Sequence, residues 1–328
     1  MDSVLGTLVD EQLGPGLKNQ ELAKLLCSDM DAIDALVVRT YPRALTIALK
    51  TLQLKPGDRV VISPLSPPCY IWLLQELHLE IVFADVDPRT GCLQAGQIKK
   101  LSANIPDAIL LHEPLGNLAE VEAFRGLSIP IIEDITQSIH SRKDGHMAGS
   151  LGHVLVVSFE DDAMLSAGGG AAVLVKNKKY DSFMLDYTNF GMHYDLLPDI
   201  NSALVMNQMR VLDKLIEKRE SYFETCRHAL MKTKHQLINE HNDQTHHNGY
   251  TFSVLLDSRV KDVQKYVKKY KIEVAMPFEQ CALTMMQIDR TDFPNSVPYI
   301  LRAMIFPLYP LLSKDQLMTL VRVLSTLP

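Results

Sequence analysis

The chain has 328 residues, of which 47% are hydrophobic and 22% charged, and its net charge at pH 7 is −6. This length is enough for one large or two modest domains that bury their own cores. The mild negative charge gives no general electrostatic reason to bind nucleic acid or an anionic membrane, so we expect neither as a partner.

Cysteine usage and the first residues indicate the compartment. The chain has five cysteines, an odd number without a CxxC pair, which argues against a zinc site or a disulfide framework. The first residues are acidic and lack the basic start of a signal peptide, and no stretch approaches the ~18 uncharged apolar residues of a membrane helix. We therefore expect a cytoplasmic protein without a bound metal.

Short apolar runs alternate with helical patterns through the first two thirds of the chain. Helix-like segments, such as 71–77 and 118–124, separate most of these runs. Buried strands joined by helices predict βαβ units and a mostly parallel sheet. The expected strands are 59–62, 80–84, 108–112, 129–132, 154–159 and 171–175.

The last third begins with a helical pattern over about 201–232, and a polar break at 239–249 follows. We interpret the break, which contains His246 and His247, as a solvated loop, because no second pair of metal ligands has suitable spacing. The remaining pattern indicates a smaller α+β unit. Its expected elements are strands at 250–256, 272–276 and 303–309, a helix at 260–270, and a last helix that begins with Ser313 and Gln316 in capping-box spacing.

This order of elements predicts two domains. The first is a large α/β domain over 1–235, which includes an N-terminal arm over 1–20 and the long helix. The second is a small C-terminal α+β domain over 250–328.

Several segments of the chain resemble those of a known family. Together they resemble the DegT/DnrJ/StrS sugar aminotransferases over nearly the whole chain. The resemblance implies an α/β fold of type I among transferases that depend on pyridoxal phosphate (PLP), with a mostly parallel seven-stranded sheet. The segments are P-G-D-R-V at 56–60, F-A-D-V-D-P at 83–88, I-E-D-I-T-Q at 132–137, G-S-L-G at 149–152 and V-S-F-E-D-D-A-M-L-S-A-G-G-G at 157–170.

The segment at 157–170 resembles the family's cofactor-lysine segment, but Ala163 stands where the lysine is expected. A lysine amine there forms a Schiff base with PLP and later moves protons, and a methyl group does neither. The resemblance also implies that Asp134 lies against the pyridine nitrogen of PLP, Gln137 near the hydroxyl edge of the ring, and Ser158 near the phosphate.

Other cofactor positions depart from the family pattern as well. The S-G-T that binds the phosphate is replaced by a segment with a bulky Tyr41 and with Pro42, which has no amide hydrogen. A proline replaces the aromatic that stacks on the ring, and an acidic residue enters the N-Y-R segment that reaches the neighbouring phosphate. We therefore expect PLP or pyridoxamine phosphate to bind weakly or not at all. The aligned residues are Thr40, Tyr41, Pro42, Pro67 after Ser66, and His193-Tyr194-Asp195.

Two weaker signals have ordinary interpretations. The glycines at 168–170 lack the spacing of a phosphate loop and precede a strand, so we expect a turn between paired strands. His112 ends a strand, where it either lines the substrate pocket or only caps the strand.

Three functions stay open. The first is a catalytically impaired or repurposed relative of the nucleotide-sugar aminotransferases. The second is an active PLP transaminase of a nucleotide-linked keto sugar, in which Ala163 is an engineered change. The third is a non-catalytic structural or regulatory partner of an active paralogue. The resemblance implies a homodimer, because each site of the family borrows residues from the partner subunit, and it implies a nucleotide sugar as the ligand.

Overall fold

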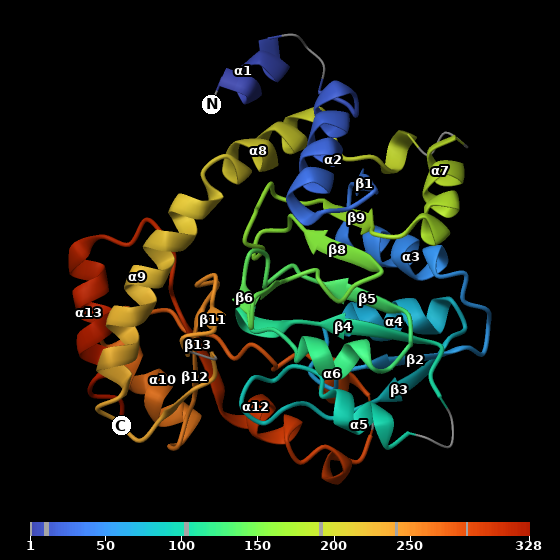
Figure 1. The fold of residues 1–328 in the computed structure, drawn as a ribbon. Helices are drawn as coiled ribbons and strands as arrows, with labels where there is room; N and C mark the ends of the chain where they lie inside the picture. Colours follow the sequence, from blue (N-terminus) through green and yellow to red (C-terminus); the bar gives the residue numbers. More distant parts are fainter. Residues whose placement is uncertain (1, 10–12, 102–104, 190–192, 240–241, 287) are drawn as a thin grey trace.

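The computed structural model describes residues 2–9, 13–101, 105–189, 193–239, 242–286 and 288–328 (Figure 1). The expected arm over 1–20 therefore lies partly outside the described residues. The described part of the arm contains α1 (Asp2–Val9), which packs against α8 (Asp199–Met209), and the start of α2 (Leu17–Met30).

A seven-stranded sheet forms the centre of the larger part of the molecule. The strands lie in the order β1 (Asp34–Val38), β9 (Ala171–Val175), β8 (Val154–Ser158), β5 (Ile131–Asp134), β4 (Ala108–His112), β2 (Arg59–Ile62) and β3 (Glu80–Phe83). In this order, neighbouring strands are parallel from β8 through to β3, whereas β9 runs antiparallel to both of its neighbours. The prediction of a mostly parallel seven-stranded sheet is confirmed.

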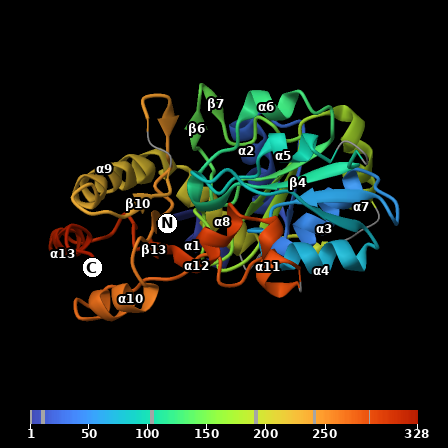
Figure 2. The ribbon, with the colours of Figure 1, turned by 90° about the horizontal axis from the view of Figure 1, so that it is seen from below.

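Helices cover both faces of this sheet, which explains why its strands read as unbroken apolar runs (Figures 1 and 2). Side chains alternate along a strand, so Val156 packs in one core and Leu155 and Val157 pack in the other. The first face carries α3 (Tyr41–Thr51), α4 (Pro68–Glu76) and α7 (Asp181–Asn189). The second carries α2, α8, α5 (Ala95–Lys99) and α6 (Val121–Arg125).

The long helix expected over 201–232 is two helices in the structure. The first, α8, ends at Met209, and α9 runs over Leu212–Leu230. Between them, Val211 has φ −122° and ψ 6°, outside the helical range. The first part of α9 packs on the sheet core through Leu212 and Ile216, whereas its second half belongs to another core.

That other core belongs to the smaller α+β unit. It contains Phe223 and Cys226 of α9, so it includes part of a helix that we expected in the large domain, and the domain boundaries stay a prediction. The expected strand at 272–276 is wrong, because the only described pairing there is a single bridge between Ala275 and Ile305. The elements are β10 (Gln236–Leu237), β12 (Phe252–Leu255), β13 (Ala303–Phe306), α10 (Val260–Lys268), α11 (Ala282–Met285), α12 (Ser296–Arg302) and α13 (Lys314–Leu324).

Two local predictions are confirmed. Ser313 caps α13 by accepting from the backbone of Gln316 at 3.2 Å, and the Gln316 side chain accepts from Ser313 N at 2.8 Å. The glycines at 168–170 connect the paired strands β8 and β9, and all three have positive φ, the left-handed region that glycine enters without strain.

The polar break at 239–249 is not a solvated loop throughout, although its residues 240–241 lie outside the described part. Thr245 and His246 form β11, which joins β6 (Arg142–Lys143) and β7 (His146–Met147) in a small sheet. His247 is buried, stacks on Phe223 with ring centres 5.3 Å apart, and contacts Leu115 O at 2.7 Å. The prediction was wrong for this histidine because polarity was read as exposure, whereas hydrogen bonds allow polar groups to be buried.

Short 3-10 turns complete the described elements: η1 (Pro114–Gly116), η2 (Lys178–Tyr180), η3 (His193–Asp195) and η4 (Arg290–Asp292). Among the helices of the described ranges, none is both long and apolar enough to span a bilayer.

Candidate functional site

Most of the predicted site residues lie at one edge of the central sheet. Parallel strands present their carboxyl ends on the same side, which is where open α/β sheets bind ligands. Asp134 ends β5 and Ser158 ends β8, while His112, at the end of β4, is the direct neighbour of Asp134 in the sheet register. The segments that begin α3 and α4 follow β1 and β2, so Tyr41 and Pro67 lie at this edge too.

The carboxylate of Asp134 is fully enclosed and fully hydrogen-bonded. Its side chain has 0% exposure. Its Oδ2 accepts hydrogen bonds from the hydroxyls of Tyr41 and Tyr70, the latter at 2.6 Å. Its Oδ1 accepts from the backbone N of Thr136 at 3.1 Å and from the Thr136 hydroxyl at 2.6 Å. A carboxylate has about four acceptor positions, and these four bonds fill them.

Both tyrosines are held as hydrogen-bond donors. Burial raises the pKa of Tyr41 and the pKa of Tyr70 well above the usual value, and the negative charge of Asp134 raises both further. Their hydroxyls therefore stay protonated at neutral pH. Sequence reasoning singled out Tyr41 only as a bulky residue in place of a glycine, and it missed Tyr70, which the sequence presents as an ordinary residue within a helix.

His112 completes the surroundings of Asp134. Its ring is buried edge-on to Tyr70, with ring centres 6.3 Å apart. Its Nδ1 lies 3.9 Å from Asp134 Oδ2, which is too far for a hydrogen bond. Burial lowers the pKa of His112, so the ring is neutral at pH 7. His112 therefore lies beside the enclosed carboxylate instead of lining an open pocket.

Gln137 and Ser158 both make local hydrogen bonds. Gln137 Oε1 accepts from Leu115 N at 2.7 Å and so supports the loop that follows β4. Ser158 Oγ accepts from Glu160 N at 3.1 Å, and Ser158 N donates to the Thr136 hydroxyl at 3.0 Å. Thr136 thereby connects the end of β8 with Asp134. The expected role of Ser158 at the cofactor phosphate stays a prediction.

Ala163 lies in the wall of an open cleft of about 500 Å³. The Asp161-Asp162-Ala163 turn forms one side, and the segments around Tyr250, Glu273 and β13 form the other. The Tyr250 hydroxyl donates to Asp162 O at 2.7 Å, so it ties the two sides together.

Arg219 supplies the cationic group of this cleft. It donates to three carbonyl oxygens, those of Gly249, Tyr250 and Leu308, and so holds the cleft wall together. Burial lowers the pKa of Arg219 to about 10, which leaves the guanidinium charged at neutral pH.

The first turn of α3 has few backbone donors left for an anion. Thr40 Oγ1 accepts from Arg43 N at 3.3 Å, and Thr40 O accepts from Ala44 N at 3.1 Å. Pro42 has no N–H. Of the first four backbone positions after Thr40, only Tyr41 keeps an N–H that donates to no other described residue.

The segment that contains His193 and Asp195 is tied to its own chain. Asp195 Oδ2 accepts from Arg43 Nη2 at 2.6 Å and also from the hydroxyl of Tyr187. Arg39 donates through its backbone N to Asp195 O at 2.8 Å. His193 itself is exposed. The expected cross-dimer role of this segment stays a prediction.

Pro67 precedes α4 and is partly buried, beside a fully buried Ser66. A proline ring offers no aromatic face, so it cannot replace a stacking aromatic.

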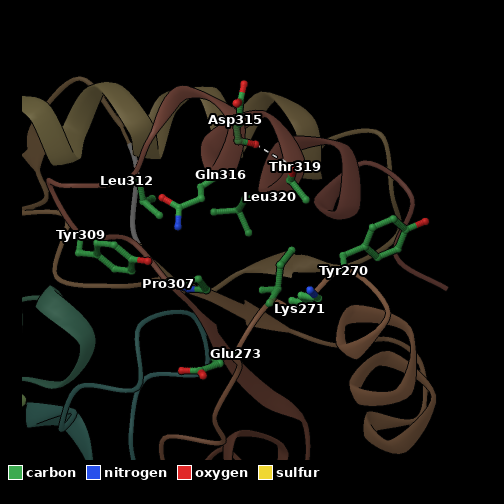
Figure 3. A pocket seen from close by; sticks show the side chains of 11 residues that line it. Tyr270, Lys271, Glu273, Pro307, Tyr309, Leu312, Asp315, Gln316, Thr319 and Leu320 are labelled. Carbon is green, nitrogen blue, oxygen red and sulfur yellow. Dashed lines mark hydrogen bonds between the residues drawn. The ribbon is translucent and has the colours of Figure 1, made fainter.

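A second hollow, of about 470 Å³, lies wholly in the smaller unit (Figure 3). Lys271, Gln316 and Leu320 line it beneath α13, with Tyr309 at one end. None of the predicted site residues lines this hollow. In the described ranges, no three His, Cys, Asp or Glu side chains are grouped to hold a metal.

Comparisons with solved structures identify the fold. The chain superposes with a TM-score of 0.88 on a DegT DnrJ EryC1 StrS aminotransferase from Brucella abortus, at 19% identity over 98% of this chain and 93% of that one. The sugar aminotransferase Spr1654 from Streptococcus pneumoniae was solved in PLP and pyridoxamine phosphate forms. The chain superposes on it with a TM-score of 0.89, at 14% identity over 99% of this chain. The fold is thus that of the PLP-dependent aminotransferases.

Sequence comparisons define the family. The model of the DegT/DnrJ/EryC1/StrS aminotransferase family matches residues 1–325, and the chain belongs to this family. It is 22% identical to the spore coat polysaccharide biosynthesis protein SpsC of Bacillus subtilis, over 96% of this chain and 90% of that protein. It is 26% identical to UDP-4-amino-4,6-dideoxy-N-acetyl-beta-L-altrosamine transaminase of Campylobacter jejuni, over 67% of this chain and 64% of that protein.

The residues present do not fit the family's cofactor. Position 163 has no amine, and the amine of Lys176 donates to Gly149 O at 3.2 Å. Asp134 has no acceptor position left for a ring nitrogen, since Tyr41, Tyr70 and Thr136 occupy them. The first mismatch concerns the amine that would bind the PLP aldehyde, and the second concerns the acceptor for the pyridine nitrogen.

Proposed function

We propose that this chain is a catalytically impaired or repurposed member of the sugar-aminotransferase family, which keeps the fold without the transaminase chemistry. The proposal rests on the resemblance of residues 157–170 to the family's cofactor-lysine segment, in which Ala163 stands at the position of the lysine. Without an amine at this position, the chain has no nucleophile for the aldehyde of PLP and no base to move the proton of the substrate carbon.

We further propose that PLP and pyridoxamine phosphate bind weakly or not at all. The supporting observations are independent of position 163. Asp134 is saturated by hydrogen bonds, and Pro42 removes a backbone donor from the first turn of α3. Each missing hydrogen bond to a charged group removes about 1.5–3 kcal/mol of binding free energy.

The proposed ligand is a small polar molecule of the nucleotide-sugar class. Support comes from the names of the relatives, one acting in polysaccharide biosynthesis and one on a UDP-linked amino sugar. The cleft beside Ala163 has a volume of about 500 Å³, which falls within the usual range of small-molecule pockets.

We also propose that the protein is a cytoplasmic homodimer. Exposed apolar side chains gather on the N-terminal segment and need a cover, and a second copy of the chain is the partner that the family resemblance favours. All five cysteines are free, which suits a reducing compartment. Sedimentation that shows only monomer at micromolar concentration contradicts the dimer. The exposed residues are Leu5, Leu8, Val9, Leu13 and Leu17.

The experiment that tests the impaired function restores the amine. Ala163→Lys is compared with Ala163→Gln, which adds a similar bulk without a nucleophile. We expect neither variant to show the absorbance band of a PLP Schiff base or to transfer an amino group, because Asp134 and the first turn of α3 have changed as well. Full activity of Ala163→Lys would mean that alanine is the single lesion in an otherwise intact transaminase.

A further inference from the structure

We propose that Tyr41 is a built-in plug, whose hydroxyl takes the place of a ligand's ring N–H on Asp134 and so keeps the aminotransferase fold closed to pyridine cofactors. This deepens the proposed function, since it concerns the same pocket, but it depends on Tyr41 instead of Ala163. It identifies a residue that determines which ligands the site excludes.

The hydrogen bonds of Asp134 leave no acceptor position for a ligand. A ligand N–H needs an acceptor position on this carboxylate, and the four positions are taken by Tyr41, Tyr70 and twice by Thr136. The side chain of Asp134 has no exposed surface. A ligand therefore reaches the carboxylate only after one of these donors has left.

Of the three residues that donate to Asp134, Tyr41 is the plug. Thr136 belongs to the same turn as Asp134 and bonds it from two residues away, so it is part of the carboxylate's own support. Tyr70 is fully buried inside α4 and packs edge-on to His112, so it belongs to the core. Tyr41 is only partly buried and begins α3, directly after the exposed Thr40.

The hydroxyls of Tyr41 and Tyr70 also satisfy the buried charge of Asp134. A buried carboxylate without donors is unfavourable, and in an enzyme a bound ligand can supply the missing donor. Here the two phenols supply it from within the chain, so the folded state does not depend on a cofactor. Tyr41 therefore stabilises the buried Asp134 carboxylate by donating the hydrogen bond that a ligand would otherwise supply.

The test uses pyridoxamine 5′-phosphate as the probe, because it lacks an aldehyde and its binding does not require an amine at position 163. Isothermal titration calorimetry compares the wild type with Tyr41→Ala. We expect no heat of binding for the wild type at millimolar probe, and at least a tenfold gain in affinity for Tyr41→Ala. The gain disappears in the double variant Tyr41→Ala/Asp134→Asn, because the probe then has no carboxylate to bind.

The matched control is Tyr222→Ala in α9, which removes a partly buried phenol bonded to Leu312 O at 3.3 Å. This variant should bind no probe. Circular dichroism and thermal melting report whether each variant is folded.

Two results would overturn the proposal. One is a wild type that binds the probe and loses this binding on Asp134→Asn, a measurement that does not require the Tyr41 variant to fold. The other is a folded Tyr41→Ala without any gain in affinity. The second result overturns the plug alone, because a wild type that binds no probe still agrees with the weak binding proposed above, whereas the first result contradicts both proposals. Neither result bears on the missing amine at position 163, which is tested separately by Ala163→Lys.

Discussion

Arg43 and Asp195 form an ion pair within one chain, with 2.6 Å between Nη2 and Oδ2, although 152 residues separate them in the sequence. Burial acts to raise the pKa of Asp195, but hydrogen bonds from Tyr187 and Arg43 outweigh it and lower the pKa. Asp195 is thus bound as an internal anion beside the start of α3.

This pair gives the first prediction. Asp195→Asn should destabilise the protein by about 1 kcal/mol, because a partly exposed ion pair contributes modestly. The effect should shrink in 1 M salt, where charges are screened. Urea denaturation at two salt concentrations measures it. Asp186→Asn, an exposed carboxylate on α7, is the control, and an equal loss in both variants would contradict the assignment.

The second prediction concerns pH and His140. A hydrogen bond to Asp29, 2.9 Å from the ring, is the largest cause that raises the pKa of His140 above its usual value. The stabilisation is therefore full below about pH 6.5 and is lost as the pH rises through the higher folded pKa. Asp29→Asn should destabilise the protein more at pH 6 than at pH 9. A loss that is equal at both values, measured by urea denaturation, would contradict this.

The third prediction concerns Asn248, which is fully buried where the two parts of the molecule meet. Its side chain donates to Gln137 O and Ile139 O and accepts from Tyr250 N, each at 3.0 Å. Asn248→Ala removes the partner of three backbone groups, of which Ile139 O is buried, and should cost roughly 3 kcal/mol.

The control for Asn248 lies nearby. Asn242 accepts from Gln244 N at 2.8 Å on the exposed surface, so Asn242→Ala should cost less than about 1 kcal/mol. A smaller loss for Asn248→Ala than for Asn242→Ala in chemical denaturation would refute the structural role.

The sheet was predictable from the sequence because its strands are buried on both faces. Runs such as that of β8, in which every residue is buried, leave little ambiguity. The capping box at Ser313 was equally readable, since both of its partners are local. The break at Val211 and the missing strand at 272–276 depend on tertiary packing, which local patterns do not record.

The candidate site was predictable only in part. The resemblance implied that Asp134 and Ser158 share one pocket, and the structure has both at the carboxyl ends of neighbouring strands. The resemblance did not show that Tyr70, 64 residues earlier in the chain, shares an oxygen of Asp134 with Tyr41. Such a meeting of distant side chains has no local sequence signal.

The most direct test of the missing Schiff base is the mass of the wild-type protein after exposure to PLP. The protein is incubated with one equivalent of PLP, reduced with borohydride and digested for peptide mapping by mass spectrometry. We expect no stoichiometric adduct on any lysine near the site, because Ala163 has no amine and Lys176 lies at the opposite edge of the sheet, where it donates to Gly149 O. A stoichiometric PLP adduct on a lysine near the cleft would contradict the missing Schiff base.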